Sequence, residues 1–268
     1  MNPAFEPGTV WLVGAGPGDP GLLTLNAAHA LAEADVVLHD ALVSPEILAL
    51  APRARLEPVG KRAGGARTKQ LRINQRLIDL ARDRQRVVRL KGGDPLVFGR
   101  GGEEALALAA AGIRFRIIPG ISAGIGGTAS AGIPVTHRGL ARSVAFVTGH
   151  DATGELPALD WHALSRGADV LVLYMALRQA GAIAARLRAA GRAPDEPVAF
   201  ISAASTPRQR VAITTLAEAA TIAASIPATA PTLIVVGPVV ALRALTEAWQ
   251  DIAAPFEGEA DAEPSHAA

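Results

Sequence analysis

The sequence contains no cysteine among its 268 residues. Disulfide bonds, thiolate nucleophiles and cysteine-ligated metals are therefore excluded. It also has no run of about 18 apolar residues, the length that a membrane-spanning helix needs, so we expect no membrane span. Residues 1–8 are acidic and contain proline, and they lack the basic start and apolar stretch of a secretory signal. Together these absences favour a cytoplasmic enzyme.

Net charge is nearly absent too, because the formal balance at pH 7 is only +1. Such a chain has no overall field to attract nucleic acid or a membrane surface. Lysine is scarce: three of the 26 basic residues are lysines and the rest are arginines. A GC-rich genome is the simpler explanation. Arginine also binds carboxylates through two parallel hydrogen bonds, so an acidic small substrate is the alternative.

Apolar residues are abundant, at 50% of the chain, which allows a sizeable core. Short β-branched runs alternate with stretches rich in alanine and leucine, a pattern typical of an α/β protein with largely parallel strands. We expect strands at residues 9–13, 35–39, 86–90, 115–118, 143–148, 169–174, 198–202 and 232–236. We expect helices at residues 23–34, 45–50, 70–84, 102–111, 180–190 and 216–224.

The turn segments that separate the expected strands and helices change in character near residue 140, where we place a domain boundary. Residues 8–140 are expected to form an N-terminal α/β domain and residues 141–250 a C-terminal α/β domain. Residues 251–268 are small, acidic and proline-bearing, which predicts a disordered tail. No additional domain for oxidation or metal insertion is expected, and no internal repeat is present.

Three glycine-bearing segments follow predicted strands. In the first, residues 14–21, a dinucleotide-binding fingerprint would need glycines at positions 14, 16 and 19, but position 19 is aspartate and Pro17 stiffens the turn. The second, residues 90–95, lies at a strand's carboxyl end, the edge where open α/β sheets bind ligands. The third, residues 119–123, contains Ser122, which suits either a helix cap or a ligand contact. Structural turns are the alternative explanation for all three.

Apart from the initiator, Met175 is the one methionine, directly after an apolar strand. A polarizable thioether adapts to a flat ring, although a core filler is the simpler explanation.

Several longer segments, taken together, are far more specific than any one glycine loop. They are VGAGPGDPGLLTL (13–25), ADVVLHDALVSPEIL (34–48), VGKRAG (59–64), RLKGGDPLVFGRGGEE (89–104), PGISAGIGGTASAGIPVTHRG (119–139), VTGH (147–150) and YM (174–175). With these segments the chain resembles the tetrapyrrole methylase family over about residues 8–250. The resemblance implies a two-domain α/β fold with mixed, largely parallel sheets, a cofactor cleft between the domains, and a homodimer.

The resemblance also implies a reaction, the C-methylation of uroporphyrinogen III at two ring carbons, giving precorrin-2 via precorrin-1. The methyl donor would be S-adenosyl-L-methionine, with S-adenosyl-L-homocysteine as product and no metal. The product could feed sirohaem or cobalamin biosynthesis. By the family's motifs, the cofactor-binding residues are Pro17, Gly92, Gly93, Asp94, Val97, Ser122, Ala123, Met175, Ala204 and, as a weaker addition, Thr232.

Two catalytic roles follow from the same resemblance: Asp40 is expected to accept a proton and Lys61 to donate one. Asp40 follows a strand that reads as buried, and burial could raise a carboxylate's proton affinity. From the residues alone, a turn aspartate and a surface ion-pair lysine are the simpler interpretations.

The substrate's carboxylates need positive partners, and five arginines lie beside the candidate loops. They are Arg62, Arg67, Arg100, Arg138 and Arg142. Two other functions remain open. One is a sister methylase acting on a later precorrin, and the other is a non-catalytic nucleotide-binding protein that uses the same glycine loops.

Overall fold

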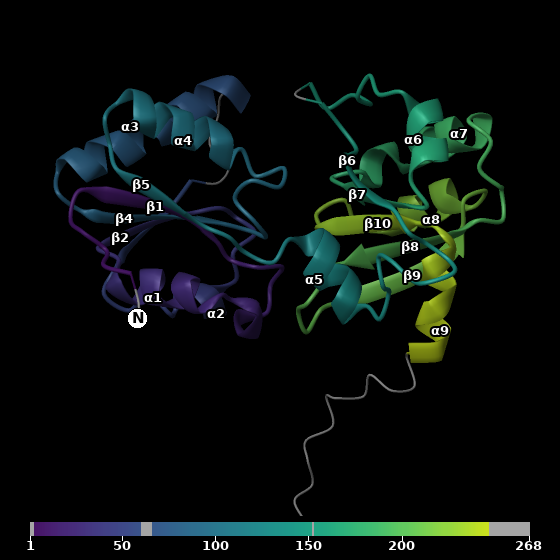
Figure 1. The fold of residues 1–268 in the computed structure, drawn as a ribbon, viewed down its shortest axis with the longest axis horizontal. Helices are drawn as coiled ribbons and strands as arrows, with labels where there is room; N and C mark the ends of the chain where they lie inside the picture. The colour runs from purple at the N-terminus through teal and green to yellow at the C-terminus, as the bar shows by residue number, and fades with distance from the viewer. Residues whose placement is uncertain (1–2, 60–65, 152, 247–268) are drawn as a thin grey trace, which may run out of the picture.

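The computed structural model describes residues 3–59, 66–151 and 153–246, which form two five-stranded sheets in sequence order. The two sheets lie next to each other along the longest axis of the molecule (Figure 1). The predicted α/β class with mixed, largely parallel sheets is confirmed. Among the described residues, no helix combines the length and hydropathy needed to traverse a bilayer.

The first sheet has the strand order β3-β2-β4-β1-β5, and its pairings are parallel. Its strands are β1 (Thr9–Gly14), β2 (Val36–His39), β3 (Arg55–Pro58), β4 (Arg86–Lys91) and β5 (Phe115–Ile118). Parallel pairing brings the carboxyl ends of all five strands to one edge. The glycine segments after β1, β4 and β5 are therefore neighbours.

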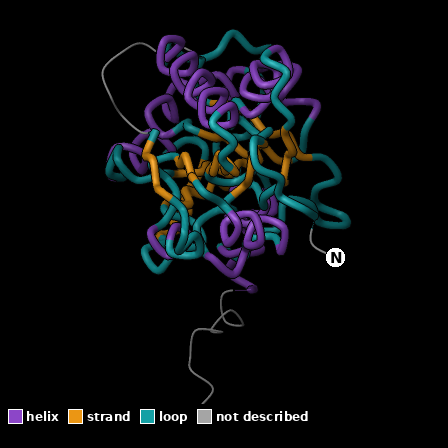
Figure 2. Tube along the Cα trace, turned by 90° about the vertical axis from the view of Figure 1, so that its left-hand side faces the viewer, coloured by secondary structure: helices purple, strands orange, loops and turns teal. Residues whose placement is uncertain are grey.

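Helices cover both faces of this sheet, as Figure 2 shows from its side. The helices α1 (Leu25–Glu33) and α2 (Pro45–Leu48) pack on one face, and α3 (Ala66–Arg82) and α4 (Gly101–Ala110) on the other. Short polar side chains begin α1 and α2. Thr24 Oγ1 accepts a hydrogen bond from the Ala27 N–H at 3.1 Å, and Ser44 Oγ accepts from the Ile47 N–H at 3.4 Å.

The second sheet has the order β6-β7-β10-β8-β9. Its strands are β6 (Val144–Thr148), β7 (Val170–Tyr174), β8 (Pro197–Ser202), β9 (Arg210–Thr215) and β10 (Thr232–Val236). The β6–β7 pairing is parallel, and the pairings that involve β8 and β10 are antiparallel. The helices α6 (Trp161–Gly167), α7 (Ala180–Ala189) and α8 (Ala219–Ser225) cover one face.

The other face of the second sheet is covered by α5 (Ala123–Ser130), the helix that follows the third glycine segment. Ala131 and Ile133, directly after α5, pack into the same core as Val170 and Val172 of β7. The chain thus reaches the second sheet within a few residues of the end of β5. The division of the domains at residue 140 stays a prediction, and the predicted tail at 251–268 lies outside the described residues.

Candidate functional site

The first glycine loop (residues 14–21) and the second (residues 90–95) are joined by backbone hydrogen bonds. The Gly93 N–H donates to the Gly16 carbonyl at 2.8 Å, and the Gly16 N–H donates back to the Gly93 carbonyl at 3.2 Å. Both glycines have positive φ, 71° at Gly16 and 68° at Gly93, which residues with a Cβ rarely adopt. Glycine is therefore required at both positions of this clasp.

The third loop (residues 119–123) packs directly onto the first two. A Cβ on Gly120 would collide with the Gly93 carbonyl oxygen, and a Cβ on Gly14 would lie 2.5 Å from the Gly120 Cα. Asp94 holds the arrangement together: its Oδ2 accepts from the Gly120 N–H at 3.0 Å, and its Oδ1 accepts from the Leu96 N–H at 2.8 Å. Three loops that are far apart in sequence thus meet at one point.

Tyr174, the last residue of β7, connects this junction to the second sheet. Its hydroxyl accepts a hydrogen bond from the Gly124 N–H at 2.7 Å and shares another with the Ser122 hydroxyl at 2.7 Å. Burial is the main reason why the pKa of this phenol is raised above its ordinary value. The ring of Phe98, from the loop after β4, lies 4.9 Å from the Tyr174 ring.

Tyr174 was not among the predicted site residues, although it precedes Met175 in a segment that carried the family resemblance. Its place at the end of a buried strand was the available signal. Ser122, predicted as either a cap or a ligand contact, makes no capping hydrogen bond to α5 and turns its hydroxyl to Tyr174 instead. Ala123 packs partly buried in the same core as Tyr174.

The loops around the junction adopt left-handed backbone conformations at non-glycine residues. Phe98 has a φ of 51°, Met175 of 54°, Ala203 of 48° and Ser205 of 57°. Such conformations cost of order 1–3 kcal/mol each when unfavourable contacts are not relieved, and they collect at functional sites. The Met175 side chain is 47% exposed, so it is not the core filler that was the simpler expectation.

The loop between β8 and β9 approaches the first glycine loop from the second sheet. A Cβ on Gly18 would lie 2.6 Å from Thr206 Cγ2 and 3.1 Å from the Ala204 carbonyl oxygen. Ala204 itself packs against α5, because a Cβ added to Gly127 of this helix would lie 2.8 Å from the Ala204 Cβ. The two sheets are therefore in contact through the predicted cofactor loops.

The other predicted cofactor residues occupy the same region. Pro17 contacts α5, because a Cβ on Gly126 would lie 3.0 Å from its Cγ. Val97 packs partly buried against the core that contains Tyr174. Thr232, at the start of β10, shares a hydrogen bond of 2.9 Å with Ser202 at the end of β8. Gly92 lies beside Leu42, whose Cβ would be 3.4 Å from a Cβ added to the glycine.

Asp40 follows β2 on the same edge of the first sheet, and its Oδ1 accepts a hydrogen bond from Arg89 Nη2 at 2.6 Å. The strand before it is buried as expected, whereas the Asp40 side chain itself is 35% exposed. Burial is reduced here because β2 ends at His39 and Asp40 begins the following loop. Lys61, its predicted catalytic partner, lies outside the described residues.

Three of the arginines expected to bind carboxylates have side chains that the structure describes. Arg100 forms a two-fold ion pair with Glu103, at 2.8 and 2.7 Å. Arg138 is exposed after α5. Arg142 precedes β6, at the opposite end of the second sheet from Tyr174, so we do not expect it to join this site. Arg62 and the side chain of Arg67 lie outside the described residues.

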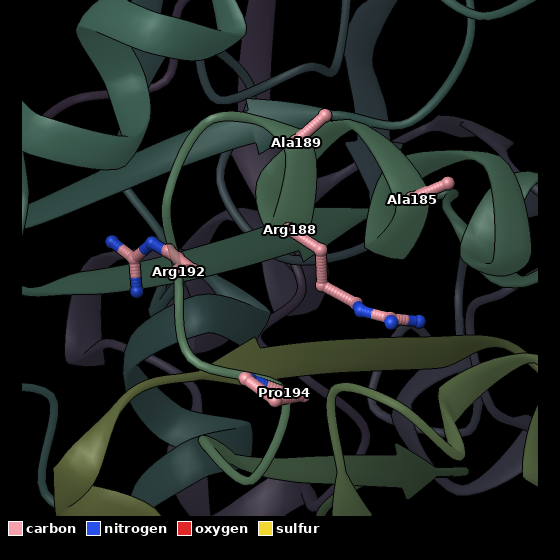
Figure 3. Close-up of a pocket in the computed structure, with 5 residues that line it drawn as sticks. All are labelled: Ala185, Arg188, Ala189, Arg192 and Pro194. Atoms are coloured by element: carbon pink, nitrogen blue, oxygen red, sulfur yellow. The ribbon is translucent and has the colours of Figure 1, made fainter.

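A shallow depression of about 470 Å³ lies elsewhere, beside α7 (Figure 3). Figure 3 shows Arg188 and Pro194 on its rim, with Arg192 next to them. Arg192 is already paired with Glu196 at 2.6 Å, and its Nη2 donates to the Ala168 carbonyl. None of the predicted site residues lines this depression.

Comparison with known proteins shows the family of this chain. The model of the tetrapyrrole (corrin/porphyrin) methylases matches residues 9–220. A uroporphyrinogen-III C-methyltransferase from Sinorhizobium sp. is 58% identical over 90% of this chain and 87% of its own length. The uroporphyrin-III C-methyltransferase from Thermus thermophilus, solved with S-adenosylhomocysteine, is 43% identical, with a TM-score of 0.77 over 87% of this chain and 99% of that one.

Relatives of greater length match as well. The siroheme synthase from Neisseria meningitidis serogroup A is 52% identical over 88% of this chain, which spans 48% of that protein's length. The match to the family model covers the first sheet, the strands β6 to β9 of the second sheet and all three glycine loops. This chain belongs to the tetrapyrrole methylases.

Proposed function

We propose that this chain transfers methyl groups from S-adenosylmethionine to two ring carbons of uroporphyrinogen III, giving precorrin-2 via precorrin-1 and releasing S-adenosylhomocysteine. The single observation that carries the proposal is the junction of three glycine loops tied by Asp94 and joined to the second sheet by Tyr174. The relatives named as uroporphyrinogen-III C-methyltransferases support the choice of substrate, and the Thermus structure supports the cofactor.

The residues at the junction fit such a cofactor. Gly92 and Gly93 have no side chains, so a ligand can approach the backbone of the second glycine loop closely. Negative charge from Asp94 lies beside them, which suits the ammonium group at the amino-acid end of the ligand. The thioether of Met175 is half-exposed on the side of the second sheet, where it can pack on a flat ring.

We assign the cofactor contacts accordingly. Gly92, Gly93, Asp94 and Val97 would hold the amino-acid end, with Pro17 in the neighbouring turn. Ser122 and Ala123 would contact the ligand from the third loop, and Met175, Ala204 and Thr232 from the second sheet.

When bound, the cofactor supplies a methyl group already activated by its positively charged sulfur. The task of the protein is then to align the reacting carbon with that methyl group, and correct placement alone lowers a bimolecular barrier by about 7–11 kcal/mol. The clasp between Gly16 and Gly93 and the Asp94 hydrogen bonds give the loops this fixed geometry.

Proton transfer is the second task of the chain's own residues. Methylation of a pyrrole carbon leaves a proton to be removed, and Asp40 is our proposed acceptor. Arg89 holds one of its carboxylate oxygens at 2.6 Å, while the side chain remains in partial contact with solvent. General acid–base assistance of this kind is typically worth about 10²–10⁴-fold in rate. Lys61 is the proposed proton donor, by family resemblance.

Relatives named siroheme synthase support sirohaem biosynthesis as one destination of the product. This chain spans about half their length, so the other activities of those longer proteins are not proposed here. A homodimer and a cytoplasmic location stay predictions of the sequence.

The proposal is tested by measuring kcat/KM for methyl transfer to uroporphyrinogen III and to a later precorrin under identical anaerobic conditions. We expect transfer to uroporphyrinogen III to be preferred and to be lowered by about 10²-fold or more in Asp40→Asn. Preference for the later precorrin identifies a sister methylase. Binding of S-adenosylhomocysteine with no transfer to either substrate identifies a non-catalytic binding protein.

A further inference from the structure

A group of buried charges lies behind Asp40. Arg89 and Lys91 are two residues apart on β4, so both point to the same face of the sheet, and each side chain is 2% exposed. They face Glu104 of α4, which is fully buried. A strand flanked by parallel neighbours is normally apolar on both faces, as Val87, Val88 and Leu90 are here.

Glu104 concentrates its contacts on one oxygen. Its Oε1 accepts from Arg89 Nε at 3.0 Å, from Lys91 Nζ at 3.1 Å and from Gln70 Nε2 at 3.0 Å. Its Oε2 has no hydrogen-bond partner among the described residues. The carboxylate therefore fixes the positions of the side chains of Arg89, Lys91 and Gln70.

Arg89 connects Glu104 to Asp40 by hydrogen bonds. Its Nε donates to Glu104, its Nη2 donates to Asp40 at 2.6 Å, and its Nη1 donates to the carbonyls of Leu38 and Leu90 at 3.4 and 3.2 Å. All three nitrogens are engaged, so the planar guanidinium has one orientation. Of the charged residues in this network, Asp40 is the one that reaches solvent, next to the second glycine loop.

Burying such charges is expensive, and well-packed apolar residues in their place are often neutral or stabilising. A role beyond stability accounts for them better. We propose that Glu104 is a positioning residue, which through Arg89 sets the orientation of the Asp40 carboxylate beside the second glycine loop. This inference rests on the proposed function, because it assigns Asp40 the proton-accepting role.

The test is a double-mutant cycle between Glu104→Gln and Asp40→Asn. Glutamine keeps the size of Glu104 and one acceptor oxygen but removes the charge that holds Arg89. We expect Glu104→Gln to lower kcat by about tenfold or more, with KM and the Kd for S-adenosylhomocysteine within about twofold of the parent. In the Asp40→Asn background the same change should lower kcat by less than about twofold, because the positioned group is already gone.

A second variant covers the case in which Glu104→Gln does not fold. Arg89→Lys keeps the positive charge, but one ammonium group cannot reproduce the fork that joins Glu104 to Asp40. It should give the same loss of kcat and the same lack of effect in the Asp40→Asn background.

Glu196→Gln is the matched control. It breaks another largely buried arginine–glutamate pair, at 2.6 Å to Arg192, on the second sheet and away from the glycine loops. We expect it to lower Tm and leave kcat unchanged.

Equal fold losses of kcat from Glu104→Gln in both backgrounds, or no loss in the parent background, overturn the inference. If the parent transfers no methyl group, the proposed function fails instead, and Tm then decides the inference. A Tm loss in the double variant that differs from the sum of the losses in Glu104→Gln and Asp40→Asn supports the link between the two residues. A loss equal to that sum overturns it.

Discussion

The carboxylate of Asp94 accepts a hydrogen bond from the backbone N–H of Gly120 at 3.0 Å, across 26 residues of sequence. The same side chain accepts from the Leu96 N–H at 2.8 Å, so it shapes its own loop while holding the next one. A residue that we assign to the cofactor by resemblance therefore also fixes the backbone of two of the glycine loops.

Asp94→Ala should remove both hydrogen bonds and leave the Gly120 N–H without its acceptor. We expect the free energy of unfolding to fall by about 1–3 kcal/mol and the affinity for S-adenosylhomocysteine to fall by more than tenfold. Chemical denaturation and calorimetric titration measure the two effects. Asp160→Ala, which removes the cap of α6, should lower stability by about 1 kcal/mol without changing the affinity. Unchanged affinity in Asp94→Ala would contradict this account of the junction.

Gly120→Ala should disrupt the meeting point of the three loops, because the new Cβ collides with the Gly93 carbonyl oxygen and lies 2.7 Å from the Gly14 Cα. Backbone cannot move aside as a flexible side chain can. We expect a loss of about 1–3 kcal/mol or more in unfolding free energy, together with loss of cofactor binding. Gly167→Ala, at the exposed end of α6 with nothing within 4 Å, is the control and should be close to neutral. Similar unfolding midpoints for the two variants would show that the loops are not closely packed.

Tyr174→Phe should remove the hydrogen bonds of the Tyr174 hydroxyl and keep the packing of its ring, so it measures the contribution of the hydroxyl alone. The ring contact with Phe98 remains, but the Gly124 N–H loses its acceptor and Ser122 loses its partner. We expect a loss of about 1–3 kcal/mol in unfolding free energy and weaker binding of S-adenosylhomocysteine. Ser122→Ala leaves the Gly124 hydrogen bond in place and should have a smaller effect on stability. An equal or larger loss in Ser122→Ala would argue against the proposed importance of the phenol.

Stability should depend on pH through Lys91. Burial, reinforced by the positive charge of Arg89, lowers the pKa of the Lys91 ammonium below its ordinary value of 10.5. Between the lowered pKa and 10.5 the unfolded chain binds more protons than the folded one, so the stability contributed by Lys91 rises with pH. The unfolding free energy of the parent minus that of Lys91→Met should therefore increase across this alkaline window. Denaturant titrations at a series of pH values measure the difference, and a flat or falling one would contradict the assignment.

The sequence predicted the elements with clear apolar periodicity. The strands at residues 115–118 and 232–236 were placed at their observed bounds, and the glycine loops were placed at the carboxyl ends of their strands. In the first sheet, parallel pairing explains why the loops are neighbours, because it brings the carboxyl ends of the strands to one edge whatever the details of packing. The convergence of the three loops followed from that rule.

Elements and contacts that depend on tertiary structure were predicted only in part. A helix was expected to follow the third glycine loop, but its extent was not predicted, because α5 contains Gly124, Gly126 and Gly127, which disfavour a helix locally. Neighbouring groups approach each of these glycines so closely that a Cβ would clash, so packing overrides propensity there. The strand β9 was missed because half of its residues are polar and only Thr214 is buried, so that its pairing with β8 defines it. Glu104 lies in the first turn of a helix whose sequence suggests exposure to solvent. It is buried instead, against Arg89 and Lys91 of β4.

The most direct test of the central claim is to incubate the chain with uroporphyrinogen III and S-adenosylmethionine carrying a ¹³C-labelled methyl group, and to count the labelled carbons of the product by NMR. Two labelled methyl groups bound to ring carbons are predicted for the parent, and none for Gly120→Ala, in which the loop junction is broken. A tetrapyrrole recovered without label from the parent would contradict the account.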